Sequence, residues 1–442
     1  MCNGSIMDKL ISFALPLMLS GILQLMFNAV DLVVVGHFSG QEALAAVGST
    51  TALIAVFTNL FIGISLGANV LAARFYAAGR EKEMSETVHT SIMLALISGV
   101  AMAIVGVIFA KETLQLMDTP GNVIDLSTLY MRIYFMGMPF FMLYNYGAAI
   151  LRAVGDTKRP LLFLIVSGVS NAILNMILVI VFHLGVAGVA IGTVMSQLMS
   201  CVLVLRCLCK TQSSYQLHFD RLAIKGDYVK LIFQVGIPAG IQSTVINFSN
   251  VLLQSSVNSF GATAMAGYTA ANNLLGFLYV SVNAVTQACM SFTSQNYGVG
   301  KYKRMDRVLL DCLGLTVVVA GALGLGVYLF GPQILRIYTS EADVISCGME
   351  ILSITTIPYF LCGIMDLFPG ALRGMGYSAV PMVLSVIGTV GTRILWIYGF
   401  FPHNRTLFFL FISYPGSWLI TIVMQVICYL YVRKRCVGAQ KM

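Results

Sequence analysis

Charged residues are scarce in this sequence. Only 10% of the 442 residues are Asp, Glu, Lys or Arg, and 58% are hydrophobic, whereas soluble domains carry about 25% charged residues. This composition excludes an ordinary soluble protein and indicates an integral membrane protein. The net charge of +8 does not indicate nucleic-acid binding, because the Lys and Arg of membrane proteins gather in cytoplasmic loops.

Side-chain patterns for catalysis or metal binding are also missing. The ten cysteines are scattered through apolar segments without the spacing of a metal site, and no GxxxxGK[ST] motif is present to hold nucleotide phosphates. Catalysis inside a membrane needs a group such as a buried histidine, yet all five histidines map to helix ends or loops: His37, His89, His183, His218 and His403. We therefore expect neither an enzyme nor an ATP-driven pump, no cofactor, and no nucleic-acid partner.

Long apolar runs are abundant instead. Twelve segments are long enough to cross a bilayer core of about 30 Å as helices; they lie near residues 10–36, 43–70, 88–110, 128–150, 160–182, 186–208, 230–257, 264–290, 308–330, 346–370, 378–401 and 407–432. Alternate loops hold 21 of the 26 Lys and Arg, so the positive-inside rule places both termini in the cytoplasm. We expect an all-α, multi-pass protein of the cell inner (plasma) membrane, surrounded by membrane lipids.

The two halves of the sequence repeat. Two loop motifs return 221 residues later: Arg152-x-x-Gly155-x4-Pro160 as Arg373-x-x-Gly376-x4-Pro381, and Tyr76-x-x-Gly79 as Tyr297-x-x-Gly300. Six helices in each half give both halves the same orientation. We therefore expect two six-helix lobes related by a pseudo-two-fold axis along the membrane normal, as in parallel-repeat transporters. The predicted lobes are residues 1–208 and 230–442, joined by a cytoplasmic linker, 209–229.

One acidic residue, Asp31, lies inside the first apolar segment. A carboxylate near the middle of a membrane helix costs about 2.5–3.5 kcal/mol, so an intramembrane Asp is a candidate functional residue. The alternative is an Asp at the end of the helix that faces the lipid headgroups. Pro16, in the same segment, removes a backbone hydrogen bond and predicts a bend, which either is static or responds to the charge of Asp31.

These features resemble the multidrug and toxic compound extrusion (MATE) family over essentially the whole chain. The resemblance rests on twelve helices in two halves of six, the first helix with Pro16 and Asp31, and the Arg-x-x-Gly-x4-Pro loop in each half. The sequence is most similar to the bacterial branch whose cation site is in the N-terminal lobe. The positions that match that cation site are Asp31, Asn171, Asn175 and Thr193. The resemblance implies export of organic cations or drugs by alternating access, in exchange for H⁺ or Na⁺.

The spacing of these four residues supports the same site. Asn171 and Asn175 are four residues apart and share one face of a helix. By helical rise Asn175 lies about 12 Å, Asp31 about 9 Å and Thr193 roughly 10 Å from the outer surface. A carboxylate with neutral oxygens suits Na⁺, whereas a lone carboxylate suits a proton. The alternative is an interhelical hydrogen-bond network that only joins the helices, at about 0.6 kcal/mol per contact.

A second acidic residue, Asp366, lies in the tenth apolar segment and matches an aspartate that some relatives carry there. Arg393, in the eleventh segment, is a candidate counter-ion. A paired Asp366 and Arg393 would be structural or part of a gate, and an unpaired Asp366 would be a second cation or substrate site. We favour the pair.

The nearest alternative function is that of a lipid-linked oligosaccharide flippase of the same superfamily. Such proteins tend to line their cavity with Arg and Lys for the pyrophosphate, and Arg393 is the one deep cation that the sequence offers. We therefore expect small organic cations as the substrates. We also expect a chain that functions as a monomer.

Overall fold

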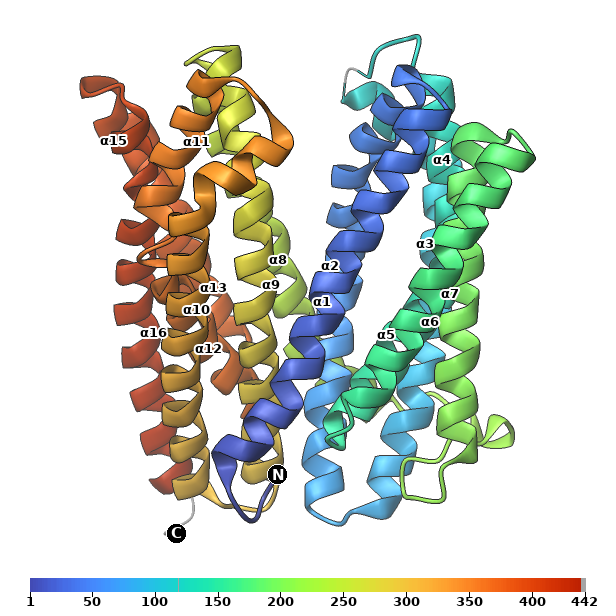
Figure 1. Ribbon diagram of the computed structural model, residues 1–442. Helices are drawn as coiled ribbons and strands as arrows, with labels where there is room; N and C mark the ends of the chain where they lie inside the picture. The colour runs from blue at the N-terminus through green and yellow to red at the C-terminus, as the bar shows by residue number, and fades with distance from the viewer. Residues whose placement is uncertain (118, 439–442) are drawn as a thin grey trace. The chain divides into compact units, whose positions relative to one another are not determined.

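The computed structural model describes residues 1–117 and 119–438, with the side chains of 52, 437 and 438 excepted. The chain folds into two compact units, and every regular element in the described residues is a helix (Figure 1). Unit 1 consists of Met1–Met18 and Ile241–Met442, and unit 2 consists of Leu19–Gly240. The predicted lobe boundaries, 1–208 and 230–442, stay a prediction.

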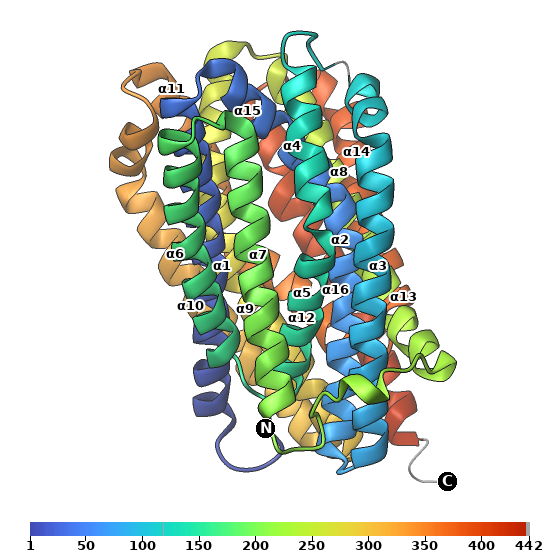
Figure 2. The same cartoon turned by 90° about the vertical axis from the view of Figure 1, so that its right-hand side faces the viewer.

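Unit 2 is built from the helices of the first half of the chain. Its cluster of buried apolar residues draws on α1 to α5, η1, α7 and α8, and α2, α3, α5 and α7 pack side by side in it (Figure 2). The elements of this half are α1 (Ile6–Phe38), α2 (Gln41–Ala77), α3 (Glu81–Leu116), α4 (Ile124–Met136), α5 (Met138–Ala153), α6 (Lys158–Met176), the π-helix η1 (Ile177–Val181), α7 (Gly185–Lys210) and the short 3-10 helix η2 (Phe219–Arg221).

Unit 1 is built mainly from the second half of the chain. Helix α9 packs against α10, α11 and α12, and α12 also packs against α16. The elements of this half are α8 (Gly226–Asn258), α9 (Ala262–Gly298), α10 (Tyr302–Tyr338), α11 (Ala342–Thr355), α12 (Tyr359–Gly374), α13 (Ala379–Ser385), η3 (Val386–Gly391), α14 (Thr392–Leu395), η4 (Trp396–Phe400), η5 (Phe401–His403), α15 (Leu407–Phe411) and α16 (Ser413–Gly438), of which η3 and η4 are π-helices.

Ten helical stretches of the described chain are long and apolar enough to cross a membrane, and the bent pair α11 and α12 makes an eleventh. The fourth predicted segment, 128–150, consists of two shorter helices, α4 and α5, which meet at Gly137. Pro139 follows at the start of α5, where proline is tolerated because its missing N–H would be unpaired in any case. All twelve predicted segments are therefore helical.

The repeated loops have the same backbone structure in both halves. Gly155 and Gly376, 221 residues apart, have φ angles of 98° and 93°, a conformation that glycine adopts without a steric penalty. The N–H of the following residue bonds to the carbonyl five positions earlier in each loop, Asp156 to Leu151 at 2.9 Å and Tyr377 to Leu372 at 2.9 Å. This is the Schellman pattern that ends a helix. The sequence repeat is thus a repeat of local structure.

Helices α1 and α8 each contribute to both units. The division between units falls after Met18 in α1 and after Gly240 in α8, and each helix carries a proline two residues before it, Pro16 and Pro238. The first turns of α1 pack in unit 1, where the ring of Phe13 lies 5.6 Å from that of Phe292 in an edge-to-face contact. A proline lacks the N–H for the helical hydrogen bond. Each helix therefore passes from one unit to the other close to the point where its backbone hydrogen bonding is interrupted.

The stretch predicted as a linker, 209–229, lies in unit 2 and is tied to α3. The backbone N–H of His218 donates to Nε2 of His89 at 3.1 Å. Tyr228 donates to Glu86 at 2.7 Å, and Leu217 is buried. These contacts fix the start of α8 to α3, because α8 begins at the end of this stretch.

Candidate functional site

The four residues predicted to bind a cation meet inside unit 2. Nδ2 of Asn175 donates to Oδ1 of Asp31 at 2.5 Å and lies 3.4 Å from Oδ1 of Asn171. Nδ2 of Asn171 in turn lies 3.5 Å from the hydroxyl of Thr193. The carboxylate on α1, the two amides on α6 and the hydroxyl on α7 therefore form one continuous polar cluster. The direct partner of Asp31 in this cluster is Asn175, which links the carboxylate to Asn171 and Thr193.

The geometry of α6 and α7 explains how the cluster forms. Asn171 and Asn175 are one turn apart on α6, so both amides point to the same side. Gly192 on α7 makes room for them, because a Cβ at that position would lie 2.1 Å from Oδ1 of Asn175. Directly after Asn175 the helix widens into η1, and π-helical turns are frequent at functional sites.

The cluster has unused hydrogen-bond acceptors. Asn175 is fully buried and Asn171 is 5% exposed. Oδ1 of Asn175 is enclosed and accepts no hydrogen bond from the described residues, although buried amide oxygens normally have a partner. This oxygen, the carboxylate and the hydroxyl of Thr193 are hard ligands of the kind that Na⁺ takes. The residues thus fit Na⁺, and the carboxylate alone fits a proton. The described residues hold no group of three or more His, Cys, Asp or Glu that could bind a transition metal.

Two tyrosines near the cluster were missed by the sequence analysis. Tyr130 and Tyr134 on α4 both interact electrostatically with Asp31. Their rings are stacked with centroids 6.1 Å apart. The only signal in the sequence is their spacing of four residues, which places them on one face of a helix. That spacing is common, so it did not distinguish them from other aromatic residues.

The structure does not bring Asp366 and Arg393 into the ion pair that we favoured. In the described part of the chain, Arg393 forms no ion pair. Nη1 of Arg393 instead donates to Oδ1 of Asn250 at 3.0 Å, and its guanidinium lies 4.2 Å from the centre of the Tyr414 ring. The charged group that acts on Asp366 is Arg373, two turns further along α12. The favoured pairing is therefore wrong for this structure, because polar and aromatic neighbours already surround Arg393.

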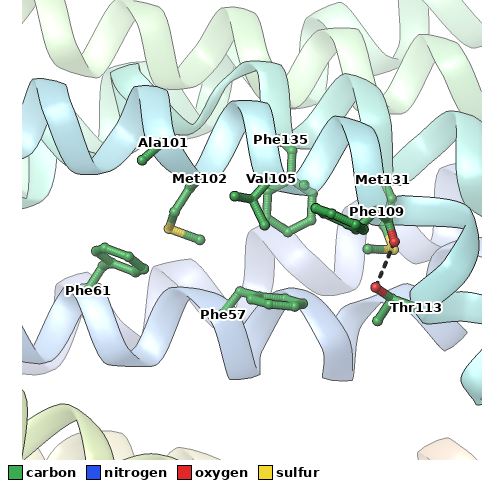
Figure 3. Close-up of a pocket in the computed structure, with 10 residues that line it drawn as sticks. Phe57, Phe61, Ala101, Met102, Val105, Phe109, Thr113, Met131 and Phe135 are labelled. Atoms are coloured by element: carbon green, nitrogen blue, oxygen red, sulfur yellow. Dashed lines mark hydrogen bonds between the residues drawn. The ribbon is translucent and has the colours of Figure 1, made fainter.

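An apolar cavity of about 130 Å³ lies elsewhere in unit 2, between α2, α3 and α4 (Figure 3). Phe57 and Phe61 reach it from α2, Met102 and Phe109 from α3, and Phe135 from α4. None of the predicted cation-binding residues lines it. Its walls are almost entirely hydrocarbon, so it is distinct from the polar cluster.

Comparison with known proteins identifies the family. A model of the family MatE matches residues 16–177 and 238–398. The probable multidrug resistance protein YoeA of Bacillus subtilis is 29% identical over 433 residues, covering 96% of this chain and 93% of that protein. The probable multidrug resistance protein NorM of Thermotoga maritima is 26% identical over 402 residues, covering 88% of this chain and 84% of that protein.

Solved structures show the same fold. An outward-facing multidrug resistance MATE family transporter of the MOP superfamily superposes with a TM-score of 0.89 at 21% identity, covering 100% of this chain and 98% of the other. A MATE transporter in complex with MaL6 gives 0.91 at 21% identity with the same coverage. This likeness confirms the predicted all-α membrane fold with two lobes of six helices. Since the family model matches both halves and most of the sequence, the chain belongs to the MatE family.

Proposed function

We propose that this protein exports organic cations across the plasma membrane in exchange for H⁺ or Na⁺. The names of its relatives include multidrug resistance and multidrug export proteins, which supports small, chemically varied substrates. The observation that carries the proposal is the buried cluster of Asp31 with Asn171, Asn175 and Thr193, in which one amide oxygen lacks a hydrogen-bond donor.

The exchange follows from competition for one charge. A carboxylate away from water is costly unless it is protonated or paired with a cation. A proton or Na⁺ and an organic cation each neutralise Asp31, so the binding of one opposes the binding of the other. Asn175 holds Asp31 in place through its amide N–H, and its free oxygen supports a bound ion. The ion gradient then drives release of the organic cation on the outer side.

Pro16 supports a way of transmitting this change. It lies in α1 two residues before that helix passes from unit 1 to unit 2. Asp31 lies further along the same helix, so a change in its charge acts on the part of α1 in unit 2. We propose that α1 bends at Pro16 when Asp31 is neutralised, and that the protein works as a monomer with both termini in the cytoplasm.

Transport into proteoliposomes tests the proposal. The purified chain is reconstituted, and uptake of a fluorescent organic cation is measured with an imposed pH gradient and, separately, an imposed Na⁺ gradient. We expect one gradient to drive transport in the wild type and Asp31→Asn to abolish it. Asp125→Asn is the matched control, because the Asp125 carboxylate is largely exposed. Gradient-driven transport by Asp31→Asn at the wild-type rate would remove Asp31 from the mechanism.

A further inference from the structure

Arg393 is a buried cation without a carboxylate partner. Only 3% of its surface is exposed, and it forms no ion pair with any residue that the structure describes. Its neighbours are neutral: Asn250 at 3.0 Å, Ser417 at 3.4 Å, Ser249 at 3.5 Å and the face of Tyr414. Charges held away from water are normally paired. A tyrosine ring offsets a guanidinium charge only in part.

The donors around this cation are not all used. Nε and Nη1 of Arg393 donate to Ser417, Asn250 and Ser249, but Nη2 donates to no described residue and is not among the fully enclosed atoms. The hydroxyl of Ser249 accepts from Arg393, and in the described chain its own hydrogen has no acceptor. One guanidinium N–H group and one hydroxyl therefore remain to hold an anion.

The position of Arg393 repeats that of the cation site in the other unit. The interval of 221 residues that relates the repeated loops also relates Thr193 to Tyr414 and Asn171 to Thr392, the residue before Arg393. The same interval takes Asp31 to Leu252 on α8, within one turn of Asn250. The backbone corresponds as well, since η1 follows the asparagines of α6 while η3 and η4 flank α14, which carries Arg393.

We propose that Arg393, with Ser249 and Asn250, forms a binding seat for the carboxylate of an amphoteric organic substrate. The two halves of the chain then carry equivalent sites of opposite charge, a carboxylate in unit 2 and a guanidinium in unit 1. A guanidinium recognises carboxylates through directed N–H donors. Asn250 holds the guanidinium in place, and Ser249 supplies a second donor. The transport part of this proposal rests on the proposed export function; the binding part does not.

The two tryptophans of the chain allow binding to be measured without transport. Trp396 is three residues after Arg393 and Trp418 is next to Ser417. The fluorescence of the purified chain in lipid nanodiscs is recorded while sodium acetate replaces sodium chloride at constant sodium and ionic strength. We expect a saturable change in the wild type. Trp396→Phe and Trp418→Phe identify which ring reports it.

Variants assign the response to the guanidinium. Arg393→Gln should weaken acetate binding by at least about tenfold, because a hydrogen bond to a charged group is lost, and Arg393→Lys should restore part of it. Arg405→Gln is the matched control, since it removes an exposed arginine of the same unit. If Arg393→Gln fails to fold, the comparison of the wild type with Arg393→Lys still tests the role of the guanidinium. A fluorescence change that is linear in acetate with the same slope in all variants, or no change in the wild type, would refute acetate binding at Arg393.

Transport tests the substrate class. Proteoliposomes are given a fluorescent amphoteric compound that carries an amine and a carboxylate, or its methyl ester, and the two rates are compared. Arg393→Gln should lower the rate ratio of acid to ester by about tenfold, while Asp31→Asn lowers both rates. Equal effects of Arg393→Gln on acid and ester would refute the carboxylate preference. If the export proposal is wrong, the wild type transports neither compound but still binds acetate.

Discussion

Replacing Gly192 by alanine should disable the cation cluster while leaving the fold intact. A Cβ at residue 192 would lie 2.1 Å from Oδ1 of Asn175. Carbon and oxygen atoms do not approach that closely, so the amide must move by about 1 Å. The clash is with the end of a side chain and not with backbone, so the amide can turn at small cost in stability.

The movement acts on the bond between Asn175 and Asp31. That bond measures 2.5 Å, and a shift of about 1 Å takes it beyond the range of a good hydrogen bond. A hydrogen bond to a charged group contributes about 1.5–3 kcal/mol, which corresponds to about tenfold or more in affinity. We therefore expect Gly192→Ala to shift the concentration of the driving ion that gives half-maximal transport by at least about tenfold. The shift is upward for Na⁺, because the amide next to the carboxylate has moved, and downward for H⁺, because a carboxylate that has lost its N–H donor is protonated more easily.

The assay is transport in proteoliposomes over a series of driving-ion concentrations, together with thermal unfolding in detergent. Gly48→Ala is the matched control, because a Cβ at residue 48 of α2 would meet no atom within 4 Å. We expect the control to match the wild type in both measurements. An unchanged half-maximal concentration in Gly192→Ala would show that the position of the Asn175 amide does not matter for ion binding, and would refute the reasoning.

Three further predictions concern the packing of each unit. Gly63→Ala should lower the stability by about 1–3 kcal/mol in thermal unfolding, because the new Cβ would lie 2.4 Å from the backbone of Gly240 on α8; equal stability to Gly48→Ala would contradict this. His89→Ala should speed trypsin cleavage after Arg221, because it removes the acceptor of the His218 N–H bond; an unchanged rate would mean that the other contacts hold this stretch alone. Asp306→Asn should lower the stability by about 1 kcal/mol, because it loses a two-point contact with Arg433 at 2.7 and 2.8 Å. Asp125→Asn is the control, and an unchanged stability of Asp306→Asn would contradict the prediction.

The fold could be predicted from the sequence because its signals are local. The length and apolar composition of each segment predict a membrane helix without reference to the rest of the chain. The glycines of the repeated loops mark helix ends, because they adopt φ angles that other residues rarely adopt. The break between α4 and α5 carries such a signal in Gly137 and Pro139. The passage of α1 and α8 between units does not, because it depends on which neighbours each half of the helix contacts.

The candidate site could be predicted in part. Asp31 stands out because a charge is rare within a membrane helix, and the spacing of Asn171 and Asn175 places both on one face. The surroundings of Arg393 could not be predicted in the same way. Its contacts with Ser249 and Tyr414 come from α8 and α16, far away in sequence, and small polar residues are frequent in membrane helices without any such role.

The sharing of α1 and α8 has a consequence for any attempt to divide the chain. Buried residues of unit 1 include Leu10 and Phe13 from α1, and those of unit 2 include Ile232 from α8. A fragment that ends before α8 would lack Ile232, and the complementary fragment would lack the two α1 residues. Each half of the gene therefore encodes part of the other half's interior, so separate expression leaves two incomplete bundles, and co-expression is the way to recover the assembled protein.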